Sequence, residues 1–367
     1  MRAGNKDYIL LSKPYVMRQP KNRPLVKLQV KGAAEKRVLV TGGAGFIGSF
    51  VTERLANMGC CVTVLDNLSS GKPEYVAGLD RVSLVKGDVC DEETVQKVLK
   101  DNEAVVHLAA LPFIPDSYHL PEEFFRVNST GTVNVLWKAI QSENVERFVH
   151  VSSSEVYGSA IHTPMNEDHP TLPHSTYAVS KLAGDRAVFT MHKEHGFPAV
   201  IIRPFNSYGP NITQPYIIPE IVSQLQGTDG HVRLGNVDSS RDFTYVTDVA
   251  EGIALGLFKD EAVGETINLG SGRDVKIREI VSLVAGIMGK KAEIELDSSR
   301  VRPYDVDRLV CDNSKAQRLL GWKPRVPLEE GLRRTVEWIL RTGITFKTPF
   351  KGWPRTYREA RVLNVQE

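Results

Sequence analysis

Short apolar runs alternate with longer amphipathic segments through the first half of this chain. An apolar run of four or five residues suits a buried parallel strand, whereas apolar positions three or four residues apart suit a helix. The runs that predict strands are residues 37–40, 61–65, 82–85, 104–108, 147–151 and 199–202, and the helical patterns lie at 46–58, 91–100, 121–141 and 177–195. This alternation predicts an α/β fold, a doubly wound parallel sheet with helices on both faces.

The pattern changes after about residue 205, where shorter elements rich in proline and glycine follow. They indicate a smaller C-terminal lobe that is interleaved with the sheet domain and does not form a separate domain. We therefore predict four parts: a basic N-terminal extension over residues 1–35, a sheet domain over 36–205, a substrate lobe over 206–345 and a tail over 346–367.

The composition is typical of a soluble globular protein, with 41% hydrophobic and 25% charged residues among 367. No stretch approaches the roughly 20 apolar residues needed to cross a bilayer, so we expect no membrane partner. The cysteines are Cys60, Cys61, Cys90 and Cys311, and neither they nor the nine scattered histidines show metal-ligand spacing. We therefore expect a reduced, cytoplasmic protein without a bound metal.

The net charge of +2 hides an asymmetry. Residues 1–36 carry nine Lys or Arg against two acidic residues, a net charge of +7, so the remainder carries −5. Such a leader suits a transit peptide or a segment that binds an acidic partner, but a single serine among its residues favours a plain surface extension. The basic residues cluster in this leader and form no recognisable nucleic-acid-binding module, so no nucleic-acid partner is expected.

A glycine-rich turn, TGGAGFIG at residues 41–48, separates the first predicted strand from the first predicted helix. Gly42, Gly45 and Gly48 recur at a spacing of three, as in Rossmann-type dinucleotide sites. There the first glycine permits the tight turn, the second admits a pyrophosphate, and the third lets helix and strand pack closely. The N-terminus of the helix favours the anion. The strand and helix around the motif favour a dinucleotide site over an ordinary glycine-rich loop.

The next predicted strand ends in Asp66, about 20 residues beyond the glycines, where a carboxylate binds the adenosine ribose hydroxyls. No arginine follows at once, so a 2′-phosphate would meet this carboxylate without a counter-charge. The sequence therefore favours NAD over NADP. The alternative is that Asp66 serves only as a turn residue at the strand end.

Tyr177 and Lys181 are four residues apart in a predicted helix, so they share one face. An ammonium at that place stabilises a phenolate, whose conjugate phenol otherwise has a pKa of about 10. A phenolate beside a nicotinamide is a base that takes a hydroxyl proton while hydride leaves the same carbon. Together with the glycine turn, this pair predicts a redox active site.

The chain resembles the extended short-chain dehydrogenases/reductases that modify nucleotide-activated sugars, over roughly residues 36–340. The motifs that carry the resemblance are TGGAGFIG (41–48), LDNLSSG (65–71), GDV (87–89), HLAA (107–110), VNSTGTVNVL (127–136), VSSSEVYG (151–158), STYAVSK (175–181), RPFNSYGP (203–210), RDFTYVTDVA (241–250), NLGSG (268–272) and LLGWKP (319–324). The resemblance implies tightly bound NAD, a nucleotide-sugar substrate and a homodimer formed through the helices at 121–141 and 177–195.

The resemblance also assigns roles to residues. It implies a catalytic trio of Ser153, Tyr177 and Lys181, with Asn128 nearby. It implies that the cofactor is bound by Gly42, Gly45, Phe46, Ile47, Gly48, Asp66, Asn67, Asp88, Val89, Leu108, Ala109, Ala110, Tyr177 and Lys181, and the substrate by Ser154, Asn206, Arg241 and Arg302. Arginine forks suit phosphate oxygens, although an arginine taken alone is more often part of a surface ion pair.

Glu155 is the residue that separates the reactions of this family. All begin by oxidising the sugar's C4 hydroxyl to a ketone. A 4-epimerase then returns hydride to the other face and needs no further acid or base, whereas a 4,6-dehydratase needs a carboxylate that removes the C5 proton. Glu155 stands where the dehydratases carry that carboxylate, but Ser154 replaces the aspartate that some of them use as the acid. A purely structural role for Glu155 is the alternative.

The sequence therefore favours 4,6-dehydration of a nucleotide sugar, with UDP as the expected nucleotide. The local sequences at residues 108–118 and 302–308 are most similar to those of UDP-N-acetylhexosamine 4,6-dehydratases. A UDP-sugar 4-epimerase is the first alternative, and a UDP-glucuronate decarboxylase is weaker because the chain reads Arg308-Leu-Val-Cys-Asp312 where those enzymes usually carry an Arg-Lys-Pro-Asp-type run. A regulatory subunit that only binds NAD or a nucleotide sugar is the non-enzyme alternative.

Overall fold

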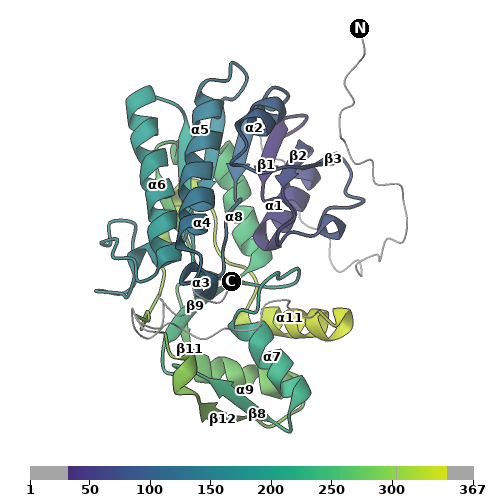
Figure 1. Cartoon of the computed structure of the whole chain (residues 1–367), viewed down its shortest axis with the longest axis vertical. Coiled ribbons are helices and arrows are strands. Elements are labelled where there is room, and N and C mark those ends of the chain that lie inside the picture. Colours follow the sequence, from purple (N-terminus) through teal and green to yellow (C-terminus); the bar gives the residue numbers. More distant parts are fainter. Residues whose placement is uncertain (1–31, 303, 345–367) are drawn as a thin grey trace, which may run out of the picture.

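A computed structural model of the chain describes residues 32–302 and 304–344 (Figure 1). The predicted tail over residues 346–367 and nearly all of the predicted basic extension over 1–35 lie outside these ranges.

Seven parallel strands form the central sheet in the order β10-β6-β5-β4-β1-β2-β3. Their bounds are β1 (Arg37–Thr41), β2 (Cys61–Asp66), β3 (Val82–Lys86), β4 (Ala104–His107), β5 (Arg147–Val151), β6 (Ala199–Pro204) and β10 (Thr266–Leu269). The predicted doubly wound sheet is confirmed, with all six predicted strands in it. The seventh, β10, pairs with β6 in parallel and comes from the part of the chain that was assigned to the smaller lobe.

Helices cover both faces of the sheet (Figure 1). One layer contains α2 (Glu92–Leu99), α5 (Thr132–Ile140) and α6 (Thr176–His195), and the other contains α1 (Phe46–Asn57) and α8 (Val246–Phe258), which pack against each other. The predicted helix over residues 121–141 is a continuous run of α4 (Pro121–Phe125), a π-helical segment η2 (Arg126–Gly131) and α5. Such π-helical segments are frequent at functional sites.

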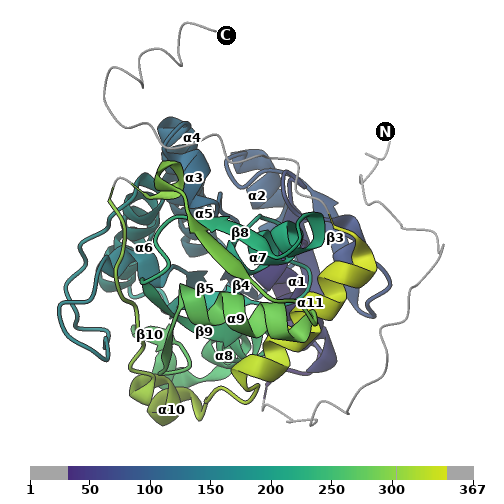
Figure 2. The same cartoon turned by 90° about the horizontal axis from the view of Figure 1, so that it is seen from below.

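The smaller lobe lies at the carboxyl edge of the sheet, and Figure 2 views the molecule from that side. It is built from β7 (Asn206–Tyr208), α7 (Ile217–Gly227), β8 (His231–Leu234), β9 (Ser240–Tyr245), β11 (Asp274–Lys276), α9 (Ile277–Ile287), β12 (Glu293–Leu296) and α11 (Leu328–Thr342), with β11-β9-β7 and β12-β8 as its two sheets. Between β9 and β11 the chain returns to the large sheet as α8 and β10. The two parts are thus interleaved, and no single cut in the sequence separates them.

Short helical segments complete the described chain. They are η1 (Pro73–Tyr75), α3 (Ile114–Ser117), η3 (Ser154–Tyr157), η4 (Asp260–Ala262), η5 (Ser298–Arg300) and α10 (Ser314–Leu320). Apolar clusters lie on both faces of the sheet, and a separate cluster fills the smaller lobe around Ile221, Ile280 and Leu332. Each part therefore has a core of its own, and the surface between the two cores is free to form a ligand site.

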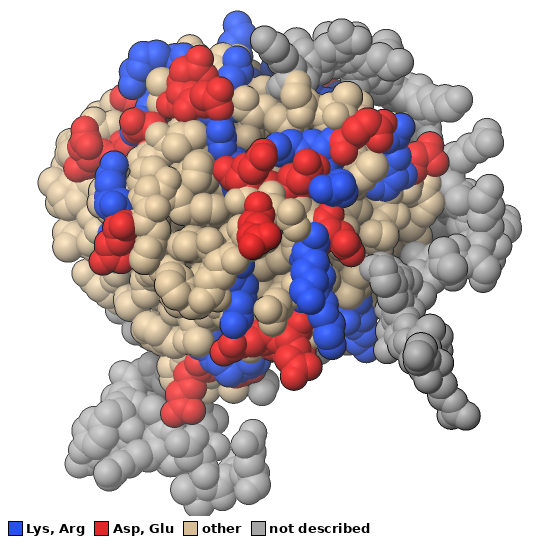
Figure 3. Space-filling model, turned by 90° about the horizontal axis from the view of Figure 1, so that it is seen from above, with Lys and Arg blue, Asp and Glu red and all other residues tan. Residues whose placement is uncertain are grey.

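The end of the molecule opposite the smaller lobe carries lysine and arginine side chains interspersed with acidic ones (Figure 3). None of the helices in the described part of the chain is long and apolar enough to span a membrane. Cys60, Cys61, Cys90 and Cys311 are all free thiols.

Candidate active site

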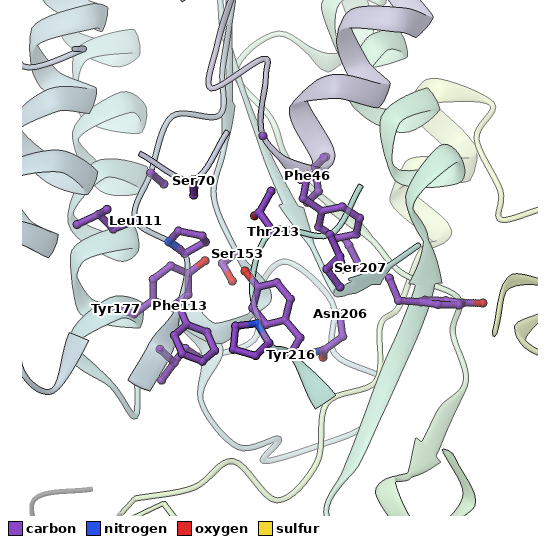
Figure 4. A pocket seen from close by; sticks show the side chains of 18 of the residues that line it. Phe46, Ser70, Leu111, Phe113, Ser153, Tyr177, Asn206, Ser207, Thr213 and Tyr216 are labelled. Carbon is purple, nitrogen blue, oxygen red and sulfur yellow. The ribbon is translucent and has the colours of Figure 1, made fainter. Parts of the chain in front are cut away.

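One large cavity lies between the carboxyl edge of the sheet and the smaller lobe, where ligands bind in doubly wound folds. Its volume is about 1020 Å³, and its wall includes the glycine turn, the end of β5, the start of α6 and segments of the smaller lobe. This size suits a dinucleotide together with a second ligand better than a single small molecule. Figure 4 shows the side chains that converge at its centre.

The glycine turn is too tightly packed at Gly42 and Gly48 for either residue to carry a side chain. Gly42 has a φ of +68°, and a Cβ there would lie 2.8 Å from the backbone of Ala109. A Cβ on Gly48 would lie 2.0 Å from the Gly42 carbonyl oxygen, whereas one on Gly45 would meet only that oxygen, at 3.1 Å. The turn thus packs strand, helix and loop together and leaves the N-terminus of α1 facing the cavity, which fits a pyrophosphate.

Asp66 ends β2 with a buried carboxylate that lines the cavity. Its oxygens accept hydrogen bonds from the backbone N–H groups of Ala44, at 3.0 Å, and Leu68, at 2.9 Å. Burial raises the pKa of Asp66 and these two hydrogen bonds oppose the rise. Each carboxylate oxygen keeps a further acceptor position. The fixed carboxylate therefore fits a ribose with free hydroxyls, as NAD requires.

The other residues expected at the cofactor fall into two groups. The residues that line the cavity are Phe46, Ile47, Asn67, Val89, Leu108, Ala109 and Ala110. Asp88 lies beside it, and its carboxylate accepts hydrogen bonds from the backbone N–H of Cys90 at 2.8 Å and from Asn67 Nδ2 at 3.3 Å. Asp88 thus shapes the loop that presents Val89.

Tyr177 and Ser153 face each other across the centre of the cavity (Figure 4). Tyr177 lies in the first turn of α6, which begins after Ser175, and the Ser175 hydroxyl accepts a hydrogen bond from Ala178 N. Ser153 lies before η3, and its hydroxyl accepts a hydrogen bond from Glu155 N at 3.2 Å. Burial raises the pKa of Tyr177 to about 12, and a hydrogen bond with the Ser153 hydroxyl opposes the rise.

Lys181 is buried below Tyr177 on the same face of α6. Its Nζ donates a hydrogen bond to the Val151 carbonyl at 2.7 Å, at the end of β5. Burial lowers the pKa of Lys181 to about 8, and the Asp185 carboxylate opposes the fall. An ammonium has three donors, so this bond fixes the side chain and leaves two N–H groups at the cavity wall.

Asn128 supports the same region from the π-helical segment. Its Nδ2 donates to the Ser180 hydroxyl at 3.0 Å and to the Leu111 carbonyl at 3.1 Å, and its Oδ1 accepts from Leu111 N at 2.8 Å. Every polar atom of its side chain is used in tying α6 to the loop after β4. Asn128 therefore positions the wall of the cavity.

Glu155 and Arg241 lie at the substrate end of the cavity, and both are buried. Burial lowers the pKa of Arg241, and the charge of Glu155 opposes the fall. The Asp305 carboxylate lies 3.5 Å from Arg241 Nη2 and 3.6 Å from Arg302 Nη1. Two guanidinium groups thus converge on one carboxylate, an arrangement that suits a diphosphate.

Asn206 and Ser154 line the same end. The Oδ1 atom of Asn206 is buried and has no hydrogen-bond partner within the described chain. Buried polar atoms are rarely left unpaired, so this carbonyl fits a site that awaits a ligand donor.

Several lining residues were not predicted from the sequence, among them Phe113, Tyr216 and Arg300. The phenol of Tyr216 points to the point where Tyr177 and Ser153 meet (Figure 4). The segment Gln214-Pro-Tyr216 gave no signal, since a lone tyrosine in a proline-containing loop has no period or motif. Across residues 32–302 and 304–344, no cluster of His, Cys, Asp and Glu has the makings of a metal site.

The sequence matches one family profile, described as GDP-mannose 4,6 dehydratase, over residues 39–335. Among curated proteins, the dTDP-glucose 4,6-dehydratase of Streptomyces niveus is 34% identical over 312 residues, which cover 82% of this chain and 92% of that protein.

Solved structures agree with this result. The dTDP-glucose 4,6-dehydratase DesIV of Streptomyces venezuelae, solved with NAD bound, has a TM-score of 0.77 and 33% identity, covering 86% of this chain and 100% of that one. The UDP-glucose 4-epimerase of Thermotoga maritima, solved with UDP-glucose, has a TM-score of 0.76 and 32% identity, covering 84% of this chain and 100% of that one.

Proposed function

This chain belongs to the nucleotide-sugar epimerase/dehydratase family of extended short-chain dehydrogenases/reductases, and we propose that its reaction is the 4,6-dehydration of a nucleoside-diphosphate hexose. It is an NAD-dependent enzyme that modifies nucleotide sugars. The proposed substrate carries a pyrimidine nucleotide, UDP or dTDP, because the similar proteins are named for dTDP-glucose and UDP-glucose.

The position of Glu155 is the observation that carries this proposal. Its carboxylate is buried at the substrate end of the same cavity as Ser153 and Tyr177. Its charge acts to raise the pKa of both Tyr177 and Arg241. Burying a carboxylate is costly unless it is paired or used. Epimerisation at C4 has no use for it, whereas dehydration needs a base at C5.

The proposed reaction begins with loss of the C4 hydroxyl proton. Tyr177 accepts this proton, and the Ser153 hydroxyl holds the sugar oxygen in line with it. Bound NAD would supply the hydride chemistry of the reaction, as the acceptor from C4 and the donor to C6. Lys181 is fixed by the Val151 carbonyl, so its remaining N–H groups are placed to hold the cofactor's ribose beside Tyr177.

The C4 ketone acidifies the neighbouring C5–H bond. Glu155 removes that proton, the bond between C6 and its hydroxyl oxygen breaks, and the C6 oxygen takes one further proton from a separate donor and leaves as water. Glu155 then returns its proton to C5 as C6 receives hydride. The net change is loss of one water from the sugar with no consumption of an external reductant.

The substrate's nucleoside diphosphate is assigned to four residues at the lobe end of the cavity. Arg241 and Arg302 are the proposed partners of the diphosphate oxygens, and Asn206 and Ser154 contribute polar contacts beside the sugar. The two guanidinium groups already converge on the Asp305 carboxylate, so this place is electrostatically suited to an anion.

A UDP-sugar 4-epimerase is the second candidate, because an epimerase with bound UDP-glucose shares the fold at a TM-score of 0.76. Its reaction would use Ser153, Tyr177 and Lys181 in the same way as the dehydration, but it gives Glu155 no role. A decarboxylase is a weaker candidate, because residues 308–312 lack the Arg-Lys-Pro-Asp-type run that those enzymes usually carry.

Product masses test the proposal. The protein is incubated with UDP-, dTDP- and GDP-hexoses, and the products are measured by mass spectrometry. Loss of one water from a pyrimidine-nucleotide hexose is expected. An unchanged mass with an inverted C4 centre would establish the epimerase, and loss of carbon dioxide from a uronic acid derivative would establish the decarboxylase.

Glu155→Gln separates the first two outcomes at the residue level. We expect it to abolish exchange of the C5 hydrogen with deuterated solvent while C4 oxidation, followed as transient NADH absorbance, persists. The expected loss of dehydration is about 10²–10⁴-fold, the range for removing a general base. Exchange at the unmodified rate would contradict the dehydratase assignment.

We also propose a homodimer formed through α4, α5 and α6. These helices expose apolar side chains on the outside of the sheet layer: Phe125, Val133, Trp137, Val179 and Phe189 are each 36–40% exposed. Apolar side chains clustered on neighbouring helices are typical of an interface. A cytoplasmic location is proposed as well, supported by the four free thiols.

A further inference from the structure

Dehydration requires one proton on the leaving C6 oxygen that the roles given to Tyr177, Ser153 and Glu155 do not supply. Hydroxide is a poor leaving group, so the C6 oxygen needs a proton as its bond to carbon breaks. The aspartate that some relatives place after the proposed catalytic serine is Ser154 here, and a serine hydroxyl is a weaker acid than a phenol. Tyr177 and Glu155 already act at C4 and C5. The donor should therefore be another neutral O–H group that faces the reacting sugar.

Tyr216 is placed for this task. It precedes α7 in the smaller lobe, so it approaches the cavity from the wall opposite α6. Figure 4 shows its phenol oxygen pointing toward the Tyr177 phenol and the Ser153 hydroxyl. Its ring packs edge-on against Phe113, with the ring centroids 6.0 Å apart, which fixes the direction of the hydroxyl.

The surroundings of Tyr216 and Tyr177 give the two phenols different pKa values. Burial raises the pKa of Tyr216, the charge of Tyr177 adds to the rise, and no hydrogen bond from a described residue opposes it. Tyr177, in contrast, has the Ser153 hydroxyl as a partner that favours its ionised form. When Tyr177 is the phenolate, Tyr216 is thus held neutral, and such a separation assigns one group as the base and the other as the acid.

We propose that Tyr216 is a further catalytic residue, the general acid that donates its phenolic proton to the C6 oxygen as the bond between C6 and oxygen breaks. The inference rests on the proposed dehydratase function. It names the proton donor of that reaction and thereby explains how the site works with a serine at position 154.

The protons balance over one turnover. Tyr177 gains the C4 hydroxyl proton, and Tyr216 loses one proton to the departing water. Glu155 takes and returns the C5 proton. A single transfer from Tyr177 to Tyr216, directly or through the Ser153 hydroxyl, restores the starting state, and the convergence of these three oxygens provides the route.

Tyr216→Phe tests the proposal, because it removes one oxygen and keeps the ring against Phe113. We expect C4 oxidation and C5 hydrogen exchange at wild-type rates and water loss slower by about 10²–10⁴-fold. The matched control is Tyr75→Phe, which likewise removes a single phenol oxygen; that oxygen is buried without a hydrogen-bond partner within the described chain, and Tyr75 lies outside the cavity wall. It should dehydrate at the wild-type rate.

A changed leaving group sharpens the test. In a nucleotide sugar whose C6 hydroxyl is replaced by fluorine, fluoride leaves with much less need for a proton. The Tyr216→Phe variant should therefore eliminate fluoride within about tenfold of the wild-type rate. Equal defects on both substrates would overturn the role as acid, since they would point to substrate positioning.

Two further outcomes are decisive. Unimpaired water loss by Tyr216→Phe would overturn the role of Tyr216 alone and leave Glu155 to serve both steps. If the wild-type protein dehydrates no nucleotide sugar but epimerises one, the proposed function fails as well. The wild-type product therefore tells the two failures apart.

Discussion

Gly48 shows how little tolerance the cofactor turn has at the scale of one residue. A methyl group there would lie 2.0 Å from a backbone oxygen of Gly42, so the turn or the helix must move. For Gly48→Ala we expect a cost of about 1–3 kcal/mol from overpacking, which corresponds to roughly tenfold to hundredfold weaker NAD retention. The measurement is the NAD released per protein on denaturation.

Gly286→Ala is the control for this change. Gly286 lies in α9 with an ordinary helical φ, and a Cβ there would meet nothing within 4 Å. Alanine in a helix interior is better than glycine by roughly 0.5–1 kcal/mol, so this variant should be slightly more stable and keep its NAD. Equal NAD content in the two variants would contradict the packing argument.

Two buried histidines make the stability of the fold depend on pH. His107 and His150 stack at 5.6 Å in the middle of the sheet. Burial lowers the pKa of His107 to about 3 and that of His150 well below its ordinary value, and the Lys181 ammonium acts in the same direction. Both rings are therefore neutral in the folded state, whereas the unfolded chain binds protons near pH 6.5. Stability is full above that pH and is lost as the pH falls toward 3.

We expect this loss to show in the free energy of unfolding measured with urea between pH 7.5 and 4.5. His150→Phe should make the loss smaller by about 1–3 kcal/mol at pH 4.5, because phenylalanine binds no proton in the unfolded chain, whereas the histidine does. The comparison is internal to the pH series, so a uniform change in stability does not affect it. Parallel curves for the variant and the wild type would contradict the prediction.

At the scale of elements, one buried ion pair holds α6, which carries Tyr177 and Lys181, against the sheet. Asp185 of α6 accepts hydrogen bonds from Arg203 of β6 at 2.8 and 3.0 Å. Arg203 also donates to the Tyr157 hydroxyl, which donates to Asn268 Oδ1, each at 2.8 Å. The network thus links α6, η3, β6 and β10 behind the site.

Asp185→Asn should cost about 3–5 kcal/mol, because the Arg203 guanidinium is left buried without a counter-charge. The measurement is equilibrium unfolding in urea. Asp260→Asn removes the same charge from a pair with Arg147 in which the carboxylate side chain is 92% exposed, and it should cost less than about 1 kcal/mol. Similar losses in both variants would show that the buried network contributes no more than a surface pair.

The elements also show what could and could not be predicted from the sequence. Six strands were predicted correctly because each is a short apolar run of four or five residues. The strand β10 was missed because its four residues, Thr266 to Leu269, include a threonine and an asparagine and lie in a glycine-rich region. Asn268 is tolerated there only because Tyr157 and the Met165 carbonyl satisfy its side chain. That compensation is a property of the folded chain.

The same distinction applies to the site. The glycine turn, Asp66 and the Tyr177–Lys181 pair all line the cavity, and the sequence points to them because each is a fixed spacing next to a strand or on a helix; the roles assigned to them stay predictions. The direct hydrogen-bond partner of Lys181 could not be predicted, since the Val151 carbonyl is brought to it by the packing of α6 against β6 and η3. Tyr216 reaches the cavity only through the placement of the smaller lobe.

At the scale of the whole molecule, the arrangement of layers leaves one sheet-covering layer open to solvent. Contacts join α2, α5 and α6 on that side, and the exposed face of α5 and α6 carries Val133, Trp137, Val179 and Phe189. Tyr177, the proposed proton acceptor, belongs to α6, so association on this face would also brace the helix that positions it. This gives the proposed dimer a functional consequence besides burial of apolar area.

Trp137→Asp tests the dimer, because a carboxylate at the centre of an apolar contact would be buried without a partner. The expected cost is about 3–5 kcal/mol, which raises the dissociation constant by at least about a hundredfold and gives a monomer in light scattering at micromolar concentration. Leu340→Asp places the same charge on α11, where the wild-type side chain is 43% exposed, and should remain dimeric. A monomeric wild-type protein, or a dimeric Trp137→Asp, would contradict the assignment of this face, whereas loss of nucleotide-sugar turnover together with the dimer would show that the contact braces α6.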